Sequence, residues 1–486
     1  MKISLNGNIN RTYVQSLCMA FFHGISFSKS DKDDGLELEV SAEQMGNQIS
    51  ASACLRYVDK VSKKHKLYDA SPDEKPERAL KCAVGQVIYD ACREITQKEI
   101  EWGILTGIRP SKICAELLQV FSEEKTKSIL IDKYYLCNSK ADLVIEVTKN
   151  EMSIMSLTDN KRCSIYISVP FCPSRCNYCS FVSYVGKKLL DLIPAYVERI
   201  IEDIRHTAQL IKELGLELSC IYIGGGTPTI LTENQLERVL SAINECIDVS
   251  SLDEFTLEGG RPDTLTKGKL EVAKRRGVTR ISVNPQTLNN RVLENIGRRH
   301  TAEQFFDAYG TVRDSGIRFT NTDLIAGLDG DTIESFRNTI DKIIELSPDN
   351  VTVHTFCVKK SAQILRDNKD VFIREDEIAR QSVEYAYKSL VANGYEPYYM
   401  YRQKNTIGNL ENIGYARRGS FGLYNVFMMS DAQTVFGIGA GATTKLVYKD
   451  NEKNEILRIF SPKYPYEYLR DNQKTEQQIK EFFDRR

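Results

Sequence analysis

The sequence predicts an α/β protein whose central part is built from repeated strand–helix units. From Cys163 onward, short runs rich in β-branched residues alternate with stretches long enough for amphipathic helices. Two of these helical stretches begin with capping-box residues, Thr232 with Gln235 and Thr301 with Gln304. Glycine and polar residues follow several of the predicted strands. Alternation of this kind is typical of parallel βαβ units.

Six strands and five helices are expected in this central part. Six such units form a complete or partial barrel, whose functional loops lie at the C-terminal ends of the strands. A doubly wound open sheet has nearly the same periodicity, so the pattern alone leaves both architectures open. The predicted strands span 164–169, 220–224, 255–258, 280–283, 320–327 and 351–355, and the helices span 189–213, 232–246, 266–276, 301–315 and 332–346.

The segments on either side have a different character. Residues 1–158 mix strand and helix patterns, with helices expected at 77–96 and 110–121, and the polar stretch 150–162 indicates a boundary. After residue 360 the alternation stops. A helix at 370–393, an extended aromatic segment at 395–405, a glycine-rich strand and turn, and helices near 464–470 and 476–484 are expected there. We therefore predict three domains, an α+β domain at 1–158, the core at 159–360 and a smaller α+β domain at 361–486.

Composition excludes several classes of protein. The 486 residues carry a formal net charge of −1, which gives no support for binding nucleic acid or anionic membranes through bulk charge. We expect no signal peptide and no membrane span, because no apolar run is long enough. The 13 cysteines are odd in number and mostly scattered, which favours a reducing compartment over a disulfide framework. We expect a cytoplasmic monomer.

One group of cysteines is clustered. Cys172, Cys176 and Cys179 lie within eight residues, directly after a strand that ends near Val169. Thiolates are the usual ligands of iron–sulfur clusters, and three of them leave one iron of a 4Fe–4S cluster open. Structural zinc normally takes four protein ligands, and no further Cys or His is near in sequence. The spacing favours an iron–sulfur cluster, with zinc or chance spacing as the alternatives.

The C-x3-C-x2-C spacing resembles the signature of the radical S-adenosylmethionine (SAM) superfamily, and further motifs match in order. Gly224–Thr227 follows the second strand, Glu258 ends the third, Gln286 follows the fourth, and Asp323 lies in the fifth. The resemblance implies a partial (β/α)6 barrel and a 4Fe–4S cluster on the three cysteines, with Asp323 binding the SAM ribose. It implies SAM contacts for Tyr166, Tyr178, Gly225, Gly226, Thr227, Glu258, Gln286 and Arg298.

Within the superfamily, the chain is similar to the oxygen-independent coproporphyrinogen III oxidase-like group. The strings YRQKN, GNLENIGYA and GIGAGA, with WGILTGIRP nearer the start, resemble its HemZ-type coproporphyrinogen dehydrogenase subgroup. This implies oxidative decarboxylation of a porphyrinogen-like substrate and an electron donor such as flavodoxin or ferredoxin. The propionates of such a substrate need cations, for which the candidates are Arg402, Lys404, Arg417 and Arg418.

Two positions depart from the decarboxylating members. Ser168 stands where those members have a histidine, and Ser180-Phe181 replaces Gly-Cys after the last cysteine. This half of the chain also resembles the related haem-chaperone branch. The alternative function is therefore a haem-binding or haem-transfer protein that retains a radical SAM cluster. Such a protein needs an axial ligand, and His300 and His354 are the histidines expected near the barrel face.

Overall fold

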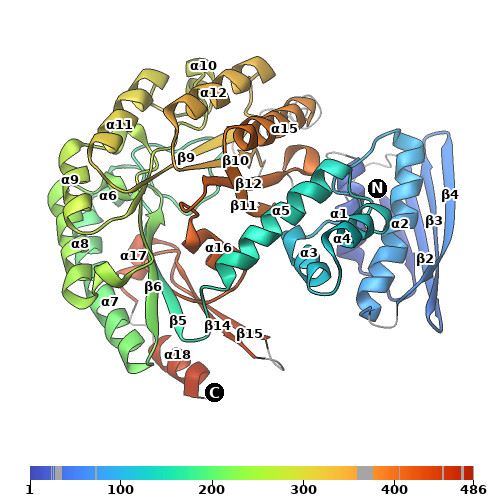
Figure 1. Cartoon of the computed structure of the whole chain (residues 1–486), viewed down its shortest axis with the longest axis horizontal. Coiled ribbons are helices and arrows are strands. Elements are labelled where there is room, and N and C mark those ends of the chain that lie inside the picture. The colour runs from blue at the N-terminus through green and yellow to red at the C-terminus, as the bar shows by residue number, and fades with distance from the viewer. Residues whose placement is uncertain are drawn as a thin grey trace. The chain divides into compact units, whose positions relative to one another are not determined.

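The computed structural model describes residues 1–22, 25, 27, 35–71, 74–357, 376–403, 406–450, 454–471 and 475–484. Two compact units are present (Figure 1). Of the described residues, the first unit contains Met1–Lys149, Asp376 and Tyr401–Leu410, and the second contains the others. Within these ranges no helix combines the length and the apolar character needed to cross a membrane. The three-domain division stays a prediction.

The first unit is a four-stranded sheet with helices on one face. Strand order is β1-β2-β3-β4, with β1 parallel to β2 and the other pairs antiparallel. Helix α2 packs across β2, β3 and β4, and α1 packs on α2 (Figure 1). The bounds are β1 Lys2–Asn6, α1 Arg11–Phe21, β2 Leu36–Met45, β3 Gln48–Tyr57, β4 Lys60–Asp69, α2 Pro76–Thr96, α3 Pro110–Leu118 and α4 Glu123–Asp132.

Helix α5 (Asn138–Met155) begins in the first unit and continues into the second. The polar stretch that was expected to separate two domains therefore starts inside a helix. The predicted helices at 77–96 and 110–121 are confirmed as α2 and α3, each with a proline in its first turn.

The second unit is built on six parallel strands that pair in the order of the sequence, β5 to β10. Helices lie along the outer side of this curved sheet (Figure 1), which gives the predicted partial (β/α)6 arrangement. The bounds are β5 Arg162–Val169, α6 Lys187–Leu190, α7 Ile193–Glu213, β6 Glu217–Gly225, α8 Glu233–Cys246, β7 Glu254–Glu258, α9 Lys267–Arg275, β8 Arg280–Ser282, α10 Asn290–Asn295, α11 Ala302–Asp314, β9 Phe319–Ala326, α12 Ile333–Leu346 and β10 Asn350–Thr355.

All six predicted strands are confirmed in this unit, and so are the five predicted helices, except that the stretch predicted at 189–213 is divided between α6 and α7. Both predicted capping boxes are formed, at Thr232 with Gln235 and at Thr301 with Gln304. Each hydroxyl accepts the backbone N–H three residues on, and each glutamine side chain returns to the N-cap.

The C-terminal segment extends the same sheet on both sides. Strand β12 runs antiparallel to β10, and β13 runs parallel to β5, so the sheet has eleven strands in the order β11-β12-β10-β9-β8-β7-β6-β5-β13-β14-β15. The bounds are α15 Asp376–Ala392, β11 Tyr395–Arg402, β12 Glu411–Arg417, α16 Leu423–Met429, β13 Thr434–Ile438, β14 Thr443–Lys449, β15 Asn454–Phe460, α17 Pro465–Tyr468 and α18 Thr475–Asp484. The part of the predicted 370–393 helix before Asp376 lies outside the described residues.

Side chains on the parallel strands alternate in polarity. Ile165 and Ile167 of β5 are buried, whereas Tyr166 between them is partly exposed, and β6 repeats the pattern with Tyr222. The rings of Tyr166 and Tyr222 stack with Tyr424 of α16, so these tyrosines face the side of the sheet on which α16 lies. Since successive strand residues point to opposite faces, this inner face carries the polar residues of the strands.

A buried ion pair joins the N-terminal ends of β7 and β8 to the C-terminal segment. Arg280 Nε lies 3.3 Å from Glu254 Oε2, and both side chains are buried. The Arg280 guanidinium also donates to the carbonyl of Ser420 at 2.9 Å, and the backbone N–H of Leu423 donates to Glu254 at 2.9 Å. The pair thereby fixes the turn that leads into α16.

We expect Arg280→Met to lower the free energy of unfolding by about 3–5 kcal/mol, because it leaves the Glu254 carboxylate buried without its counter-charge. Thermal unfolding followed by circular dichroism measures this loss. The double variant Arg280→Met/Glu254→Gln should recover part of it, since the uncompensated charge is gone. Arg238→Met, which breaks an exposed pair with Glu198, is the control and should change little. A double variant no more stable than Arg280→Met would contradict the explanation.

Candidate active site

The loop after β5 holds the three clustered cysteines and is fixed at several points. The backbone N–H of Cys172 donates to the carbonyl of Tyr184 at 3.0 Å, which closes the loop on itself. The N–H of Cys179 donates to Cys176 at 3.1 Å, and the N–H of Asn177 donates to the carbonyl of Ile296 at 3.0 Å. The loop is thus held from within and from the segment after α10.

A glycine turn at the end of β6 lies directly against this loop. The N–H of Gly226 donates to Val169 and that of Thr227 donates to Phe171, both at 2.9 Å. A Cβ on Gly226 would lie 2.6 Å from the Phe171 oxygen and 3.0 Å from Cys172 Sγ, so a side chain has no room. The Thr227 hydroxyl lies 3.3 Å from that same sulfur. Gly225 has a φ of +118°, which glycine adopts without strain.

Glu258 at the end of β7 is the next residue along the inner face. Its carboxylate lies against the glycine turn, since a Cβ on Gly224 would be 2.7 Å from Glu258 Oε2. Burial and the nearby Asp323 carboxylate raise the pKa of Glu258 to about 8, although the Gly225 N–H and Arg298 favour its ionised form. The free protein therefore holds Glu258 largely protonated at neutral pH.

Asp323 of β9 is held by amides from two neighbouring positions. Its two oxygens accept from Asn284 and Asn321, both at 2.8 Å, and His354 Nε2 of β10 lies 3.9 Å away. Burial opposes ionisation, but His354 and the hydrogen bonds outweigh it and lower the pKa of Asp323. This carboxylate is a pre-oriented hydrogen-bond acceptor, the chemistry that binds a pair of ribose hydroxyls.

Gln286 and Arg298 complete the rim of the same site. Gln286 has a φ of +70°, and its backbone pairs with β9, donating to Asp323 at 3.1 Å and accepting from Ile325 at 2.9 Å. A non-glycine residue in this conformation is strained, and such strain concentrates at functional sites. Arg298 is buried, and its Nε donates to the Tyr178 hydroxyl at 3.3 Å. It therefore places a positive charge beside the cysteine loop.

The sequence predicted these site residues, and the structure brings them together. Cys172 contacts the Thr227 hydroxyl, and Glu258 lies against the glycine turn. Gln286 is hydrogen-bonded to the backbone of Asp323, and Arg298 is hydrogen-bonded to Tyr178. Their roles toward a ligand stay predictions. Tyr166 lies in the tyrosine stack deeper inside the sheet, where burial and the Glu258 charge raise the pKa of its hydroxyl.

Other residues at the site were missed from the sequence. Asn284, Tyr222 and Tyr424 face the same interior, and buried Arg261 donates to the Ser174 side chain of the cysteine loop at 2.8 Å. Arg261 also pairs with Asp263 at 3.0 Å. The alternation of polar and apolar residues along β6 would have indicated Tyr222. Arg261 could have been found from its position three residues after Glu258.

The prediction that Arg402, Arg417 and Arg418 bind the substrate propionates is wrong. Arg402 is buried, stacks over Trp102 and donates to the carbonyl of Asn409 at 2.9 Å. Arg417 lies at the N-terminal end of β10, because β12 runs antiparallel to that strand and pairs Ala416 with Asn350. Arg418 follows it there, at the opposite end of the strands from the cysteine loop. Lys404 lies outside the described residues.

The donor set fits an iron–sulfur cluster. Cys172, Cys176 and Cys179 are free thiols, and burial raises the pKa of Cys172 and Cys179, so binding a metal centre would release protons. Across the described ranges, no three His, Cys, Asp or Glu side chains converge as ligands of a single ion. Cluster thiolates bind different irons and do not need to converge on one point.

Comparison with known proteins decides the family. Residues 166–343 match the model of the radical SAM superfamily. Over 408 residues the chain is 35% identical to the oxygen-independent coproporphyrinogen-III oxidase-like protein HemZ of Bacillus subtilis, covering 82% of this chain and 80% of that one. The chain belongs to this radical SAM family. Its cofactors are accordingly a 4Fe–4S cluster and SAM.

Two further comparisons bear on this radical SAM protein. It is 33% identical over 285 residues to the heme chaperone HemW of Lactococcus lactis, covering 58% of this chain and 69% of that one. The solved coproporphyrinogen III oxidase HemN of Escherichia coli aligns with a TM-score of 0.49 and 21% identity, over 63% of this chain and 73% of that one. By sequence identity, both the oxidase-like HemZ and the chaperone HemW are among its relatives.

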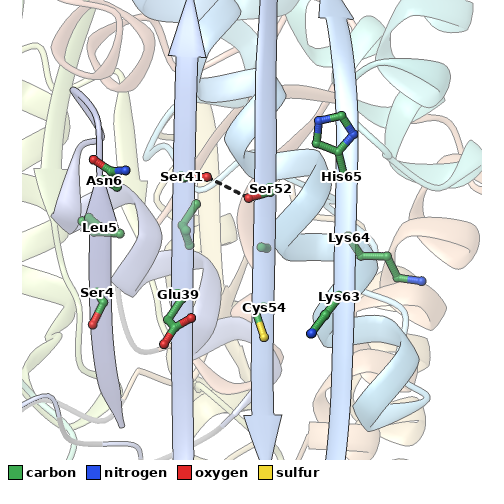
Figure 2. A pocket seen from close by; sticks show the side chains of 12 residues that line it. Ser4, Leu5, Asn6, Glu39, Ser41, Ser52, Cys54, Lys63, Lys64 and His65 are labelled. Atoms are coloured by element: carbon green, nitrogen blue, oxygen red, sulfur yellow. Dashed lines mark hydrogen bonds between the residues drawn. The ribbon is translucent and has the colours of Figure 1, made fainter.

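A separate depression of about 530 Å³ lies on the sheet of the first unit, on strands β1 to β4 (Figure 2). Serines and the charged side chains Glu39, Lys63 and Lys64 are among the residues that line it, and the hydroxyls of Ser41 and Ser52 are 2.7 Å apart. None of the predicted site residues is among the residues that line it.

Proposed function

We propose that this protein catalyses the oxygen-independent oxidative decarboxylation of coproporphyrinogen III propionates to vinyl groups. One observation carries the proposal. The cysteine loop, the glycine turn, Glu258 and Asp323 lie together at the C-terminal ends of adjacent parallel strands, where barrel enzymes place their sites. The likeness to HemZ supports the substrate, because it extends over more of the chain than the likeness to HemW does.

The roles of the site residues follow from their positions. Cys172, Cys176 and Cys179 would ligate three irons, and Gly225, Gly226, Thr227, Gln286 and Arg298 would contact SAM beside the open iron. Glu258 would accept hydrogen bonds from the SAM ammonium, and Asp323 would accept those of its ribose hydroxyls. The stacked rings of tyrosines 166, 222 and 424 line the interior below and would help to exclude water from it.

When bound, the cluster and SAM would supply the radical chemistry that removes one hydrogen atom from a propionate β-carbon. The substrate then loses CO2 and passes one electron to an acceptor, which leaves a vinyl group. The chain contributes orientation and a dry interior, both of which favour a single position for the abstracted hydrogen atom.

The haem-transfer alternative rests on the likeness to HemW. At the barrel face, however, His354 is engaged by Asp323, and His300 is buried. Ser168, which replaces a histidine, is buried and donates to the Ala440 carbonyl at 2.9 Å. These contacts favour the decarboxylase over a haem carrier that uses a barrel-face histidine.

An anaerobic assay tests the proposed function. The chain is reconstituted with iron and sulfide and supplied with SAM, dithionite and coproporphyrinogen III. We expect 5′-deoxyadenosine and CO2 in equal amounts, with vinyl products identified by mass spectrometry. Coproporphyrinogen-dependent CO2 should be absent when SAM is omitted. Tight haem binding without CO2 release would assign the chain to haem transfer instead.

A further inference from the structure

Buried Arg261 joins the turn after β7 to the cysteine loop. Its Nη1 donates to the Ser174 hydroxyl at 2.8 Å and lies 3.3 Å from the Ser174 carbonyl, to which it also donates. Ser174 lies midway between Cys172 and Cys176, two residues from each. Two residues of chain span at most about 7 Å, so the guanidinium lies close to the backbone that carries both of these thiols.

The turn that carries Arg261 is itself held in place. The Arg261 carbonyl accepts the N–H of Thr264 at 3.2 Å and the Thr264 hydroxyl at 3.0 Å. The Thr229 hydroxyl lies 2.7 Å from that of Thr264 and donates to the carbonyl of Gly259 at 2.8 Å. Both threonines are buried. Arg261 therefore reaches the loop from a backbone with little freedom to move, as a positioning contact requires.

The guanidinium also brings a buried positive charge to the loop. The Arg261 side chain is 4% exposed, whereas that of its partner Asp263 is 24% exposed. The two groups form a forked pair, with Nε 3.0 Å from Oδ1 and Nη2 3.2 Å from Oδ2. Among the described residues, no second carboxylate is hydrogen-bonded to Arg261. Since water screens the Asp263 carboxylate more than the buried guanidinium, it offsets the positive charge only in part.

A positive charge in this place favours reduction of a cluster bound to the loop. Reduction adds one electron, and therefore one unit of negative charge, and it forms and breaks no bond. The reduction potential of an iron–sulfur cluster depends on the net charge, the hydrogen bonds and the solvent exposure around it. A buried charge shifts this potential more than an exposed one does, because it is screened less.

We propose that Arg261 is a positioning residue that anchors the cysteine loop at Ser174 and raises the reduction potential of the cluster through its buried charge. The proposal rests on the proposed function, which makes Cys172, Cys176 and Cys179 the ligands of the cluster and requires the cluster in its reduced state. The planar fork of the guanidinium serves the first role and its charge serves the second, so substitution can separate the two.

Redox titration of the reconstituted full chain tests the role of the charge. Dithionite supplies the electrons, and the EPR signal of the reduced cluster is measured against the solution potential. At the potential that half-reduces wild type, the ratio of reduced to oxidised cluster should be about tenfold lower in Arg261→Gln, a shift of about 59 mV for a one-electron couple. Arg261→Lys keeps the charge and should stay within about twofold of wild type. Asp263→Asn should raise the ratio, because Arg261 then lacks its partial counter-charge.

Hydrogen exchange of the loop tests the anchor without a cluster. In the apo protein, the amides from Cys172 to Tyr184 should exchange faster in Arg261→Gln than in wild type, because the loop loses its contact with the turn after β7. Arg261→Lys should lie between the two, since an ammonium can donate to Ser174 but has no planar fork for Asp263. The matched control is Arg299→Gln, the same substitution at an exposed arginine, and it should change neither the exchange nor the potential.

Several outcomes would overturn the two roles. Equal ratios of reduced to oxidised cluster in wild type and Arg261→Gln would overturn the role of the charge. So would an equal loss in Arg261→Gln and Arg261→Lys, or a lower ratio in Asp263→Asn. Unchanged loop exchange in Arg261→Gln would overturn the anchor. If Arg261→Gln binds too little cluster to titrate, comparison of Arg261→Lys and Asp263→Asn with wild type still decides the sign of the effect.

Failure of the proposed function gives a different result. A wild-type chain that holds a reducible cluster but releases no CO2 from coproporphyrinogen III would reject the decarboxylase. The titration of the variants stays valid in that case, because it does not depend on turnover. A cluster that survives alanine at both Cys172 and Cys176 would reject the ligand assignment and, with it, the role of Arg261.

Discussion

Replacing Cys172, Cys176 or Cys179 with alanine should abolish cluster binding and SAM cleavage. In the proposed site each thiolate would ligate a different iron, and with three protein ligands in place of four the loss of another would leave the cluster too weakly held. We expect the brown absorbance of the reconstituted cluster to disappear on anaerobic desalting. Formation of 5′-deoxyadenosine should fall by at least about 100-fold, since the cofactor supplies the chemistry.

Two other cysteines provide the controls. Cys163 is buried in β5, nine residues before the first ligand, and Cys246 is exposed at the end of α8. Alanine at either position should retain the cluster and the cleavage of SAM. An intact, SAM-cleaving cluster in any of the three loop variants would refute the ligand assignment.

The second large effect is expected at Glu258. The free protein holds this carboxyl largely protonated below about pH 8, whereas the SAM ammonium is best bound by its ionised form. SAM affinity should therefore rise as the pH increases from 6.5 toward 8 and then level off. Glu258→Gln should weaken binding about 10–100-fold above pH 8, the effect of losing one hydrogen bond between charged groups.

Equilibrium binding of SAM at several pH values measures both effects. The quantity to compare is the ratio of the SAM affinity of wild type to that of Glu258→Gln. Protonation of the SAM amino group affects both affinities equally and therefore cancels in this ratio. This ratio should increase with pH, while the ratio for the exposed control Glu271→Gln should stay near one. Asp323 does not contribute to the trend, because its pKa is lowered and it stays ionised throughout. A ratio independent of pH would contradict a raised pKa at Glu258.

The apo protein should show the opposite pH trend in stability. A carboxyl whose folded-state pKa is raised stabilises the fold fully below its unfolded value and loses that contribution as the pH rises through about 8. Glu258→Gln should therefore gain stability relative to wild type in alkaline solution without SAM.

The barrel strands and their order could be predicted because local sequence determines them. Runs such as Ile165–Ile167 and Ile221–Ile223 are short, β-branched and followed by capped helices. Parallel strands joined by helices then place Gly225, Glu258 and Asp323 at one end of the sheet without any knowledge of side-chain packing.

The substrate cations could not be predicted in the same way. Arg402 and Arg417 lie in strings that resemble the family, but where their guanidinium groups point depends on chain reversals after β10. Because β12 runs antiparallel to β10, Arg417 lies at the end of the sheet opposite the cysteine loop. The guanidinium of Arg402 stacks over the Trp102 ring. Sequence spacing carries no information about such non-local pairings.

The pairing of β5 with β13 has a consequence for the order of events during synthesis. Strand β5 carries the cysteine loop, yet one of its two neighbours is built from Thr434–Ile438, roughly 270 residues later, and Ala440 accepts the hydroxyl of Ser168 beside the loop. Until that late segment leaves the ribosome, β5 remains an edge strand and Ser168 lacks its hydrogen-bond acceptor beside the loop. We therefore expect iron–sulfur loading to follow the synthesis of β13, and chains that stop short of β13 to emerge without metal.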